Sequence, residues 1–176
     1  KLMTDFIHEP FDLVLIDHHT DMQSSIVGDM LSCGNWAKKA LQNPFLHRLY
    51  LIGPSKHDLK SVERNKVLSF SIEELEQGAT IPLETKYPVY ISIDKDVLDE
   101  RYAMTNWNQG DMSLGMLEDV LAHFLKNCEV IGIDICGDDP DIDDYPTYIK
   151  AERINNLSDD ALYQTAMKIL KRRQKK

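Results

Sequence analysis

Acidic residues and a histidine gather directly after apolar runs at two separate places in the sequence. The stretch FDLVLIDHHTDMQ places Asp17, His19 and Asp21 at the end of one apolar run. The stretch VYISIDKD places Asp94 and Asp96 at the end of another. In an extended chain, residues two apart project to the same side, so each group can face one point. Carboxylates with an imidazole are typical ligands of a divalent cation.

The charges of these residues also favour a metal site. Two like unit charges ~4 Å apart repel by about 4 kcal/mol at an effective dielectric of 20, and a pair of divalent ions would remove that repulsion. A ligand set rich in oxygen with one imidazole favours Mn²⁺, then Fe²⁺ or Ni²⁺. Either motif alone is also compatible with a polar turn, but the two together at the ends of apolar runs indicate a metal centre. We interpret His18 as a residue that supports a ligand or packs beside it.

Four short apolar runs, with residues 67–70 as a further, shorter candidate, predict the strands that position these residues. Each run is continuous rather than alternating, which is typical of parallel strands covered on both faces. The predicted strands are residues 13–16, 49–52, 67–70, 89–93 and 130–135.

Helical patterns lie between the predicted strands. Residues 25–42 and 113–126 carry apolar side chains at helical spacing, the first with a break near Gly34 as an alternative, and Ser71 with Glu74 forms a capping-box pair. Residues 155–158 are expected to lead into a final helix. This alternation predicts an α/β fold with a mainly parallel, doubly wound sheet. Ligands of such sheets bind beyond the carboxyl ends of the strands, where both acidic motifs lie.

Composition indicates one globular domain and argues against two classes of protein. The chain has 176 residues, is 43% hydrophobic and carries a net charge of −9, which disfavours a broad nucleic-acid interface. No stretch approaches the ~18 consecutive apolar residues of a membrane span. No signal peptide is visible, and the three cysteines have no metal-like spacing. We therefore expect a cytoplasmic protein in which Cys128 and Cys136 are reduced and buried.

The two motifs resemble those of the arginase, agmatinase and formiminoglutamase superfamily, the ureohydrolases. Residues 17–21 look like its Asp-x-His-x-Asp motif, and residues 92–99 look like Ser-x-Asp-x-Asp-x-x-Asp. The resemblance extends from about Asp12 to Pro140. It implies a three-layer α/β/α fold, a binuclear Mn²⁺ centre and a small-molecule substrate.

The resemblance also implies roles for the motif residues. Asp17 and Asp94 would bridge two metal ions, Asp21 would complete one site, and His19 and Asp96 would complete the other. A hydroxide between the ions would attack a guanidinium or amidine carbon, so the implied activity is hydrolysis of a linear C–N bond. Asp21 would then carry a proton to the departing amine.

The family pattern is incomplete in this chain. Its sixth ligand, a His in a Gly-Gly-Asp-His-type motif before the first strand, has no match here, and residue 1 is not Met. We therefore expect residues 1–176 to form a single arginase-like domain that lacks the N-terminal part of the family fold. Two Mn²⁺ ions are implied by the family, and one ion is the alternative for a chain without the first His ligand.

The expected substrate pocket also departs from arginases. The stretch SCGNW resembles the arginase Ser-Gly-Asn loop, so Asn35 is predicted to bind substrate. Trp36 and Trp107 are predicted to stack on a flat substrate, with ordinary packing as the alternative. The Glu that pairs with guanidinium in arginases corresponds to about Gly137, which argues against arginine as the substrate.

Two other functions remain open on the sequence. An amide deacetylase-like metallohydrolase would use a zinc site with fewer carboxylates. A catalytically degenerate family member would bind metal or a partner without turnover, as the missing His and the glycine near position 137 suggest. By family analogy, a homo-oligomer is a further expectation.

Overall fold

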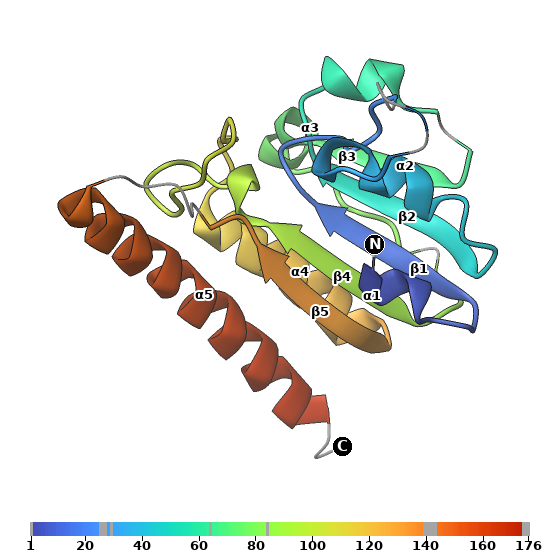
Figure 1. The fold of residues 1–176 in the computed structure, drawn as a ribbon. Helices are drawn as coiled ribbons and strands as arrows, with labels where there is room; N and C mark the ends of the chain where they lie inside the picture. The colour runs from blue at the N-terminus through green and yellow to red at the C-terminus, as the bar shows by residue number, and fades with distance from the viewer. Residues whose placement is uncertain are drawn as a thin grey trace.

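In the computed structural model, the strands form one parallel sheet through the middle of the molecule (Figure 1). The structure describes residues 2–24, 28, 30–63, 65–83, 85–138 and 144–173. The five strands, in the sheet order β3-β2-β1-β4-β5, confirm the predicted strands and their parallel direction. Their bounds are β1 (Phe11–Ile16), β2 (Leu46–Gly53), β3 (Val67–Ser71), β4 (Val89–Asp94) and β5 (Val130–Cys136).

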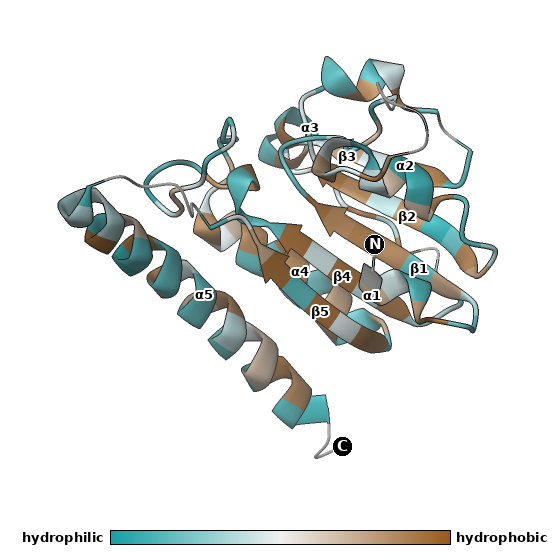
Figure 2. Ribbon diagram, viewed as in Figure 1, coloured by the Kyte–Doolittle hydropathy of each residue, from teal (hydrophilic) through white to brown (hydrophobic). Residues whose placement is uncertain are grey.

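Helices pack on both faces of the sheet and give the expected three-layer α/β/α architecture. One buried cluster joins the sheet to α3 (Ile72–Glu76), α4 (Leu114–Asn127) and α5 (Tyr145–Arg173). The cluster on the opposite face contains side chains of α2 (Trp36–Ala40) and of η2 (Asp58–Ser61), together with Ile7, which follows α1 (Leu2–Asp5). Figure 2 shows the central strands in brown, for hydrophobic residues, and much of α5 in teal.

Two predicted helix starts are confirmed by their caps. Ser71 accepts a hydrogen bond from Glu74 N (3.2 Å), and Glu74 Oε2 accepts one from Ser71 N (3.0 Å), as in a capping box. Ser113 accepts from Met116 N (3.2 Å) and caps α4. These caps set where α3 and α4 begin, and the buried cluster holds both helices against one face of the sheet.

The helical pattern predicted over residues 25–42, with a break near Gly34 as the alternative, is only partly found within the described residues. Residues 30–32 are irregular, and only η1 (Cys33–Asn35) and α2 are helical. Met30 and Leu31 are exposed rather than buried, so their spacing does not mark a core-facing helix. Residues 25–27 and 29, which belong to this predicted helical pattern, lie outside the described residues.

Helix α5 begins at Tyr145, well before residues 155–158, the residues expected to lead into it. Asp144 Oδ1 accepts a hydrogen bond from Thr147 N (2.9 Å), as an N-cap residue does. Asn155 and Ser158, which resemble capping residues in the sequence, are buried inside the helix and bind another segment. In the described part of the chain, no helix combines the length and apolar content needed to cross a bilayer.

The edge strand β5 differs from the prediction in its burial. Ile131 and Ile135 are exposed in this strand, which lies at the edge of the sheet. Cys136 at its end is exposed as well, so the prediction of a buried residue is wrong there, whereas Cys128 is buried. All three cysteines are free, as expected.

Candidate metal centre

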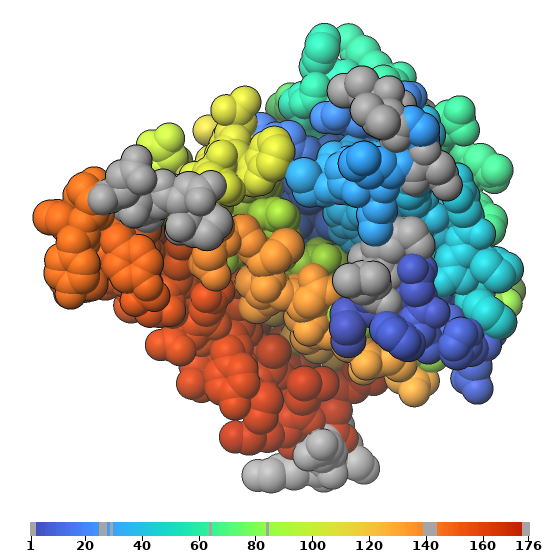
Figure 3. All heavy atoms as spheres, in the orientation of Figure 1, coloured from blue at the N-terminus to red at the C-terminus, as the bar shows by residue number. Residues whose placement is uncertain are grey.

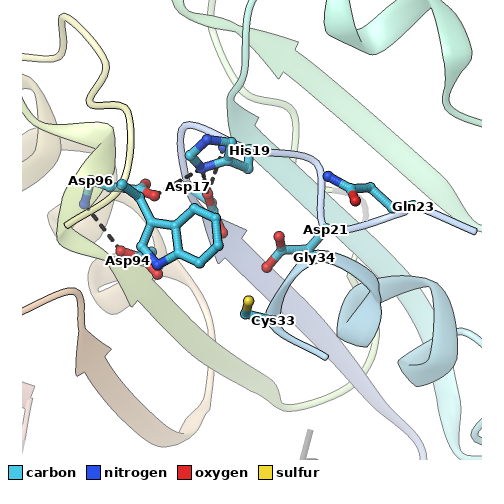
Figure 4. A pocket seen from close by; sticks show the side chains of 9 residues that line it. Asp17, His19, Asp21, Gln23, Cys33, Gly34, Asp94 and Asp96 are labelled. Carbon is cyan, nitrogen blue, oxygen red and sulfur yellow. Dashed lines mark hydrogen bonds and ion pairs between the residues drawn. The ribbon is translucent and has the colours of Figure 1, made fainter. Parts of the chain in front are cut away.

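The register of the sheet brings the two acidic motifs together. Strands β1 and β4 are neighbours, and Ile16 pairs with Ile93. The next residues, Asp17 and Asp94, therefore leave the sheet side by side at its carboxyl edge. They line one pocket (Figure 4), as the sequence motifs predict. The pocket is lined by Asp17, His19, Asp21, Gln23, Cys33, Gly34, Asp94, Asp96 and Trp107.

Tight turns, rather than an extended chain, aim these side chains at one point. His19 N donates a hydrogen bond to Asp17 Oδ1 (2.6 Å), and Asp96 N donates one to Asp94 Oδ1 (3.1 Å). Asp21 has a φ of 51°, in the left-handed region that aspartate adopts more readily than most residues. The predicted side chains do face one pocket, as expected from alternation in a strand. Each motif places them there through a turn closed by a hydrogen bond between an aspartate side chain and the backbone two residues later.

Three of the predicted ligands form a compact group. One ligand atom from each of Asp17, His19 and Asp96 lies within 4.8 Å of the others. His19 Nδ1 is 2.8 Å from Asp96 Oδ2 and 3.7 Å from Asp17 Oδ1. His18 supports this group through its backbone, because its N–H donates to Asp96 Oδ1 (3.2 Å). Two carboxylates that flank one imidazole are a donor set that fits a divalent cation such as Mn²⁺.

The electrostatics of the pocket favour a bound cation. Burial, together with the charges of Asp21, Asp96 and Asp94, raises the pKa of Asp17 well above its usual value. Burial also raises the pKa of Asp94 and brings the pKa of Asp21 to about 6. Hydrogen bonds to Asp17 and Asp96 raise the pKa of His19 to about 10. The ionised carboxylates are crowded together, and a cation would relieve the same repulsion that a proton on His19 partly relieves.

The predicted substrate-binding residues lie in different places. Trp107 lines the pocket, is 54% exposed, and lies edge-on to His19 with ring centroids 6.2 Å apart. The side chain of Trp36 instead hydrogen-bonds to Asp21, and this bond lowers the pKa of that carboxyl against the effect of burial. Asn35 is buried, and its amide bonds Ser32 N and Met30 O, both at 2.9 Å. Substrate binding by these three residues remains a prediction.

Three lining residues were not predicted as site residues: Gln23, Cys33 and Gly34. The backbone joins their two segments, because Gln23 N donates to Gly34 O (2.9 Å). In Figure 3 the blue segment around residue 35 and the yellow segment around residue 105 flank a hollow in the surface. In the sequence, the SCGNW stretch indicates a segment that borders the pocket. Its residue spacing does not show that Cys33, rather than Asn35, lines the pocket.

Gly137 occupies a position that no other residue fits without strain. Its φ is 100°, and a Cβ built there would lie 2.8 Å from Lys95 N and closer still to Asp94 Oδ1. The backbone at the end of β5 therefore packs directly on the turn that carries two predicted ligands. A larger side chain at this position would collide with that turn.

We expect Gly137→Ala to lower the free energy of unfolding by ~1–3 kcal/mol, because it adds a Cβ in the left-handed region against backbone. Gly115→Ala is the matched control, since a Cβ at Gly115 meets nothing within 4 Å. The control should be neutral or stabilise the protein by up to ~1 kcal/mol, because alanine is the better helix former. Urea denaturation of both variants checks this, and equal stabilities would contradict the tight packing at Gly137.

Comparisons with known proteins agree with the fold of this chain. A sequence model described as the arginase family matches residues 2–156. An uncharacterised protein of Thermotoga maritima is 33% identical over 149 residues, which are 85% of this chain and 56% of that protein. The chain therefore spans little more than half the length of that relative.

Solved structures that share this fold include the following three. The formimidoylglutamase of Bacillus subtilis has a TM-score of 0.68 at 17% identity, covering 92% of this chain and 54% of that chain. The agmatine ureohydrolase of Thermoplasma volcanium has a TM-score of 0.69 at 20% identity, covering 98% and 59%. A triple mutant of the T. brucei arginase-like protein, bound with Mn²⁺, has a TM-score of 0.65 at 24% identity, covering 92% and 53%.

Proposed function

Because this chain belongs to the arginase family, we propose that it hydrolyses a linear C–N bond in a guanidino or amidine compound with the help of a divalent cation, preferably Mn²⁺. Asp17, His19 and Asp96 would hold that cation. The observation that carries the proposal is the approach of their ligand atoms to within 4.8 Å, beside two further carboxylates, Asp21 and Asp94. A triple mutant of the T. brucei arginase-like protein, which shares this fold, binds Mn²⁺.

The surrounding residues suit this chemistry. A bound cation would supply Lewis acidity and lower the pKa of water, which provides a nucleophile near neutral pH. Burial places the pKa of Asp21 at about 6, so its carboxylate can accept and release a proton near neutrality. The carboxylates attract a cationic planar group, and Trp107 offers it a flat aromatic wall.

A metal-binding protein without turnover is the second candidate, and the fit at Gly137 favours it. The end of β5 cannot place a glutamate side chain at this position without displacing Asp94 and Lys95. A substrate that needs a carboxylate at that position to bind its guanidinium group would therefore not be held.

Turnover assays on the whole 176-residue chain decide between the candidates. The chain is incubated with Mn²⁺ and a panel of guanidino and amidine compounds, with an acetyl-lysine peptide as the test of amide cleavage, and urea, ammonia and acetate are measured. The proposal predicts urea or ammonia release that falls by ~10²–10⁴-fold in Asp21→Asn, because that variant loses the proton carrier. Metal binding without any product would instead support the degenerate protein, and acetate release would indicate the deacetylase.

A further inference from the structure

Lys95 lies between two predicted ligands but takes no part in the pocket. It follows Asp94 and precedes Asp96 in the 3₁₀ turn η3 (Lys95–Val97), and its side chain is 1% exposed. Its Nζ donates to Asp138 Oδ1 (2.7 Å) and to Asp159 Oδ2 (3.0 Å). The lysine thus connects the ligand turn to the end of β5 and to helix α5.

The same turn of α5 holds the chain that continues from Lys95. Asn155 Oδ1 accepts from Met104 N (2.8 Å), and Asn155 Nδ2 donates to Met104 O (2.9 Å). Ser158 Oγ donates to Tyr102 O. Positions 155, 158 and 159 share one face of a helix, and this face is directed at residues 95–104. Three side chains of α5 therefore fix one segment at both of its ends.

Residues 98–110 form a hydrogen-bonded loop next to the predicted ligands. Gln109 Nε2 donates to Leu98 O (2.9 Å) and to Ala103 O (3.0 Å). Gly110 N donates to Asp96 O (2.7 Å), so the returning chain binds the backbone of a predicted ligand. A displacement of residues 98–110 would therefore be transmitted to Asp96.

Stability alone does not account for a lysine in this place. A buried ammonium group loses its hydration, and replacing a buried ion pair by apolar residues is often neutral or stabilising. The carboxylates that compensate Lys95 are themselves accessible, with side chains of Asp138 and Asp159 exposed by 70% and 39%. The oxygen Asp159 Oδ1 is buried without a hydrogen-bond partner. These groups are fixed in a specific geometry at an energetic cost, which is expected of residues that position a site.

We propose that Lys95, with residues 155–159 of α5, positions Asp94 and Asp96 for cation binding, an inference that rests on the proposed metal-dependent function. Lys95 and Asp159 are positioning residues, since neither lines the pocket. Ser158 and Asp159 lie beyond residues 2–156, the part of the chain that the family model matches. The support therefore comes in part from a segment outside the family match.

Lys95→Met and Asp159→Asn test the proposal by Mn²⁺ titration of the whole chain. Both variants should bind Mn²⁺ ~10-fold more weakly, as is typical when a residue that orients a metal ligand is lost. Removing the positive charge of Lys95 would tighten cation binding if only electrostatics mattered, so weaker binding in both variants indicates positioning. Asp160→Asn is the control, because it makes the same charge change at an exposed residue of the same helix and should leave affinity unchanged.

Two further measurements separate positioning from general stability. The EPR spectrum of bound Mn²⁺ should change in Lys95→Met and Asp159→Asn but not in Asp160→Asn, whereas the metal-free variants should unfold near the wild-type temperature. Wild-type affinity and spectrum in both test variants would overturn the inference and leave the proposed function intact. A wild-type chain that binds no Mn²⁺ would overturn both. If Lys95→Met does not fold, the milder Asp159→Asn decides the question.

Discussion

Replacing Asp17 with asparagine is expected to weaken Mn²⁺ binding by ~100-fold or more, because a neutral amide replaces a carboxylate within the group of three ligands. The same change is expected to raise the unfolding temperature of the metal-free protein. Asparagine keeps the oxygen that accepts from His19 N but removes a buried negative charge from beside Asp21, Asp94 and Asp96. The substitution would thus stabilise the fold while it removes the proposed function.

The sign of the stability change follows from the pKa of Asp17. Burial raises this pKa above its value in the unfolded chain, so the folded state disfavours the ionised form. Stability therefore decreases as pH rises through the range between the two values, and a neutral side chain avoids that loss. Thermal unfolding with EDTA and with Mn²⁺ measures both effects, with the exposed Asp111→Asn as control. An asparagine variant that keeps wild-type Mn²⁺ affinity would exclude Asp17 as a ligand.

Mn²⁺ affinity is expected to rise about tenfold per pH unit between pH 6.5 and 8. His19 has a pKa raised to about 10 and is protonated in this range, whereas a metal ion takes the neutral imidazole. Each binding event therefore releases about one proton from His19. Below pH 6 the dependence should steepen, because Asp21, with a pKa of about 6, also becomes protonated and its charge no longer attracts the cation.

Calorimetric titrations in two buffers of different ionisation enthalpy count the released protons. His19→Gln is the informative variant, because it removes the titrating group and keeps a polar side chain of similar length. Its affinity should be weaker at pH 8 and depend less on pH than that of the wild type. An affinity that does not change with pH in the wild type would mean that His19 does not bind the ion.

The strands and the approach of the two motifs could be predicted from sequence, because both follow from continuous apolar runs and from the topology of a parallel sheet. A continuous apolar run such as that of β1 is stable only when both faces of the strand are covered. Once the sheet is parallel, the residues that follow Ile16 and Ile93 must emerge at the same edge. The positions of Asp17 and Asp94 therefore follow from hydrophobic pattern and topology together.

The local geometry of the ligands could not be predicted in the same way. Alternation along a strand says nothing about Asp21, whose left-handed φ turns the chain beyond the strand. His19 N can donate to a backbone or to a side-chain acceptor, and the residue spacing does not reveal that it donates to Asp17 Oδ1. The five predicted ligands do line the pocket, but the sequence argument assigned the wrong backbone conformation to them and missed Gln23, Cys33 and Gly34.

Polar residues with tertiary partners account for the main errors in the helices. Asn155 and Ser158 have the composition of a helix start, yet their side chains satisfy backbone groups more than fifty residues away in sequence. Lys95 has its partner Asp159 at a separation of 64 residues. Local propensity cannot distinguish such a tertiary contact from a helix cap. The start of α5 and the contacts that hold the ligand turn are therefore known only once the three-dimensional structure is known.

Anomalous X-ray diffraction from crystals of the whole chain grown with Mn²⁺ tests the central claim most directly. The account predicts a manganese peak at the carboxyl edge of β1 and β4, coordinated by Asp17, His19 and Asp96. At saturating Mn²⁺, a map with no peak among these three side chains, or with the only peak elsewhere on the protein, would contradict it.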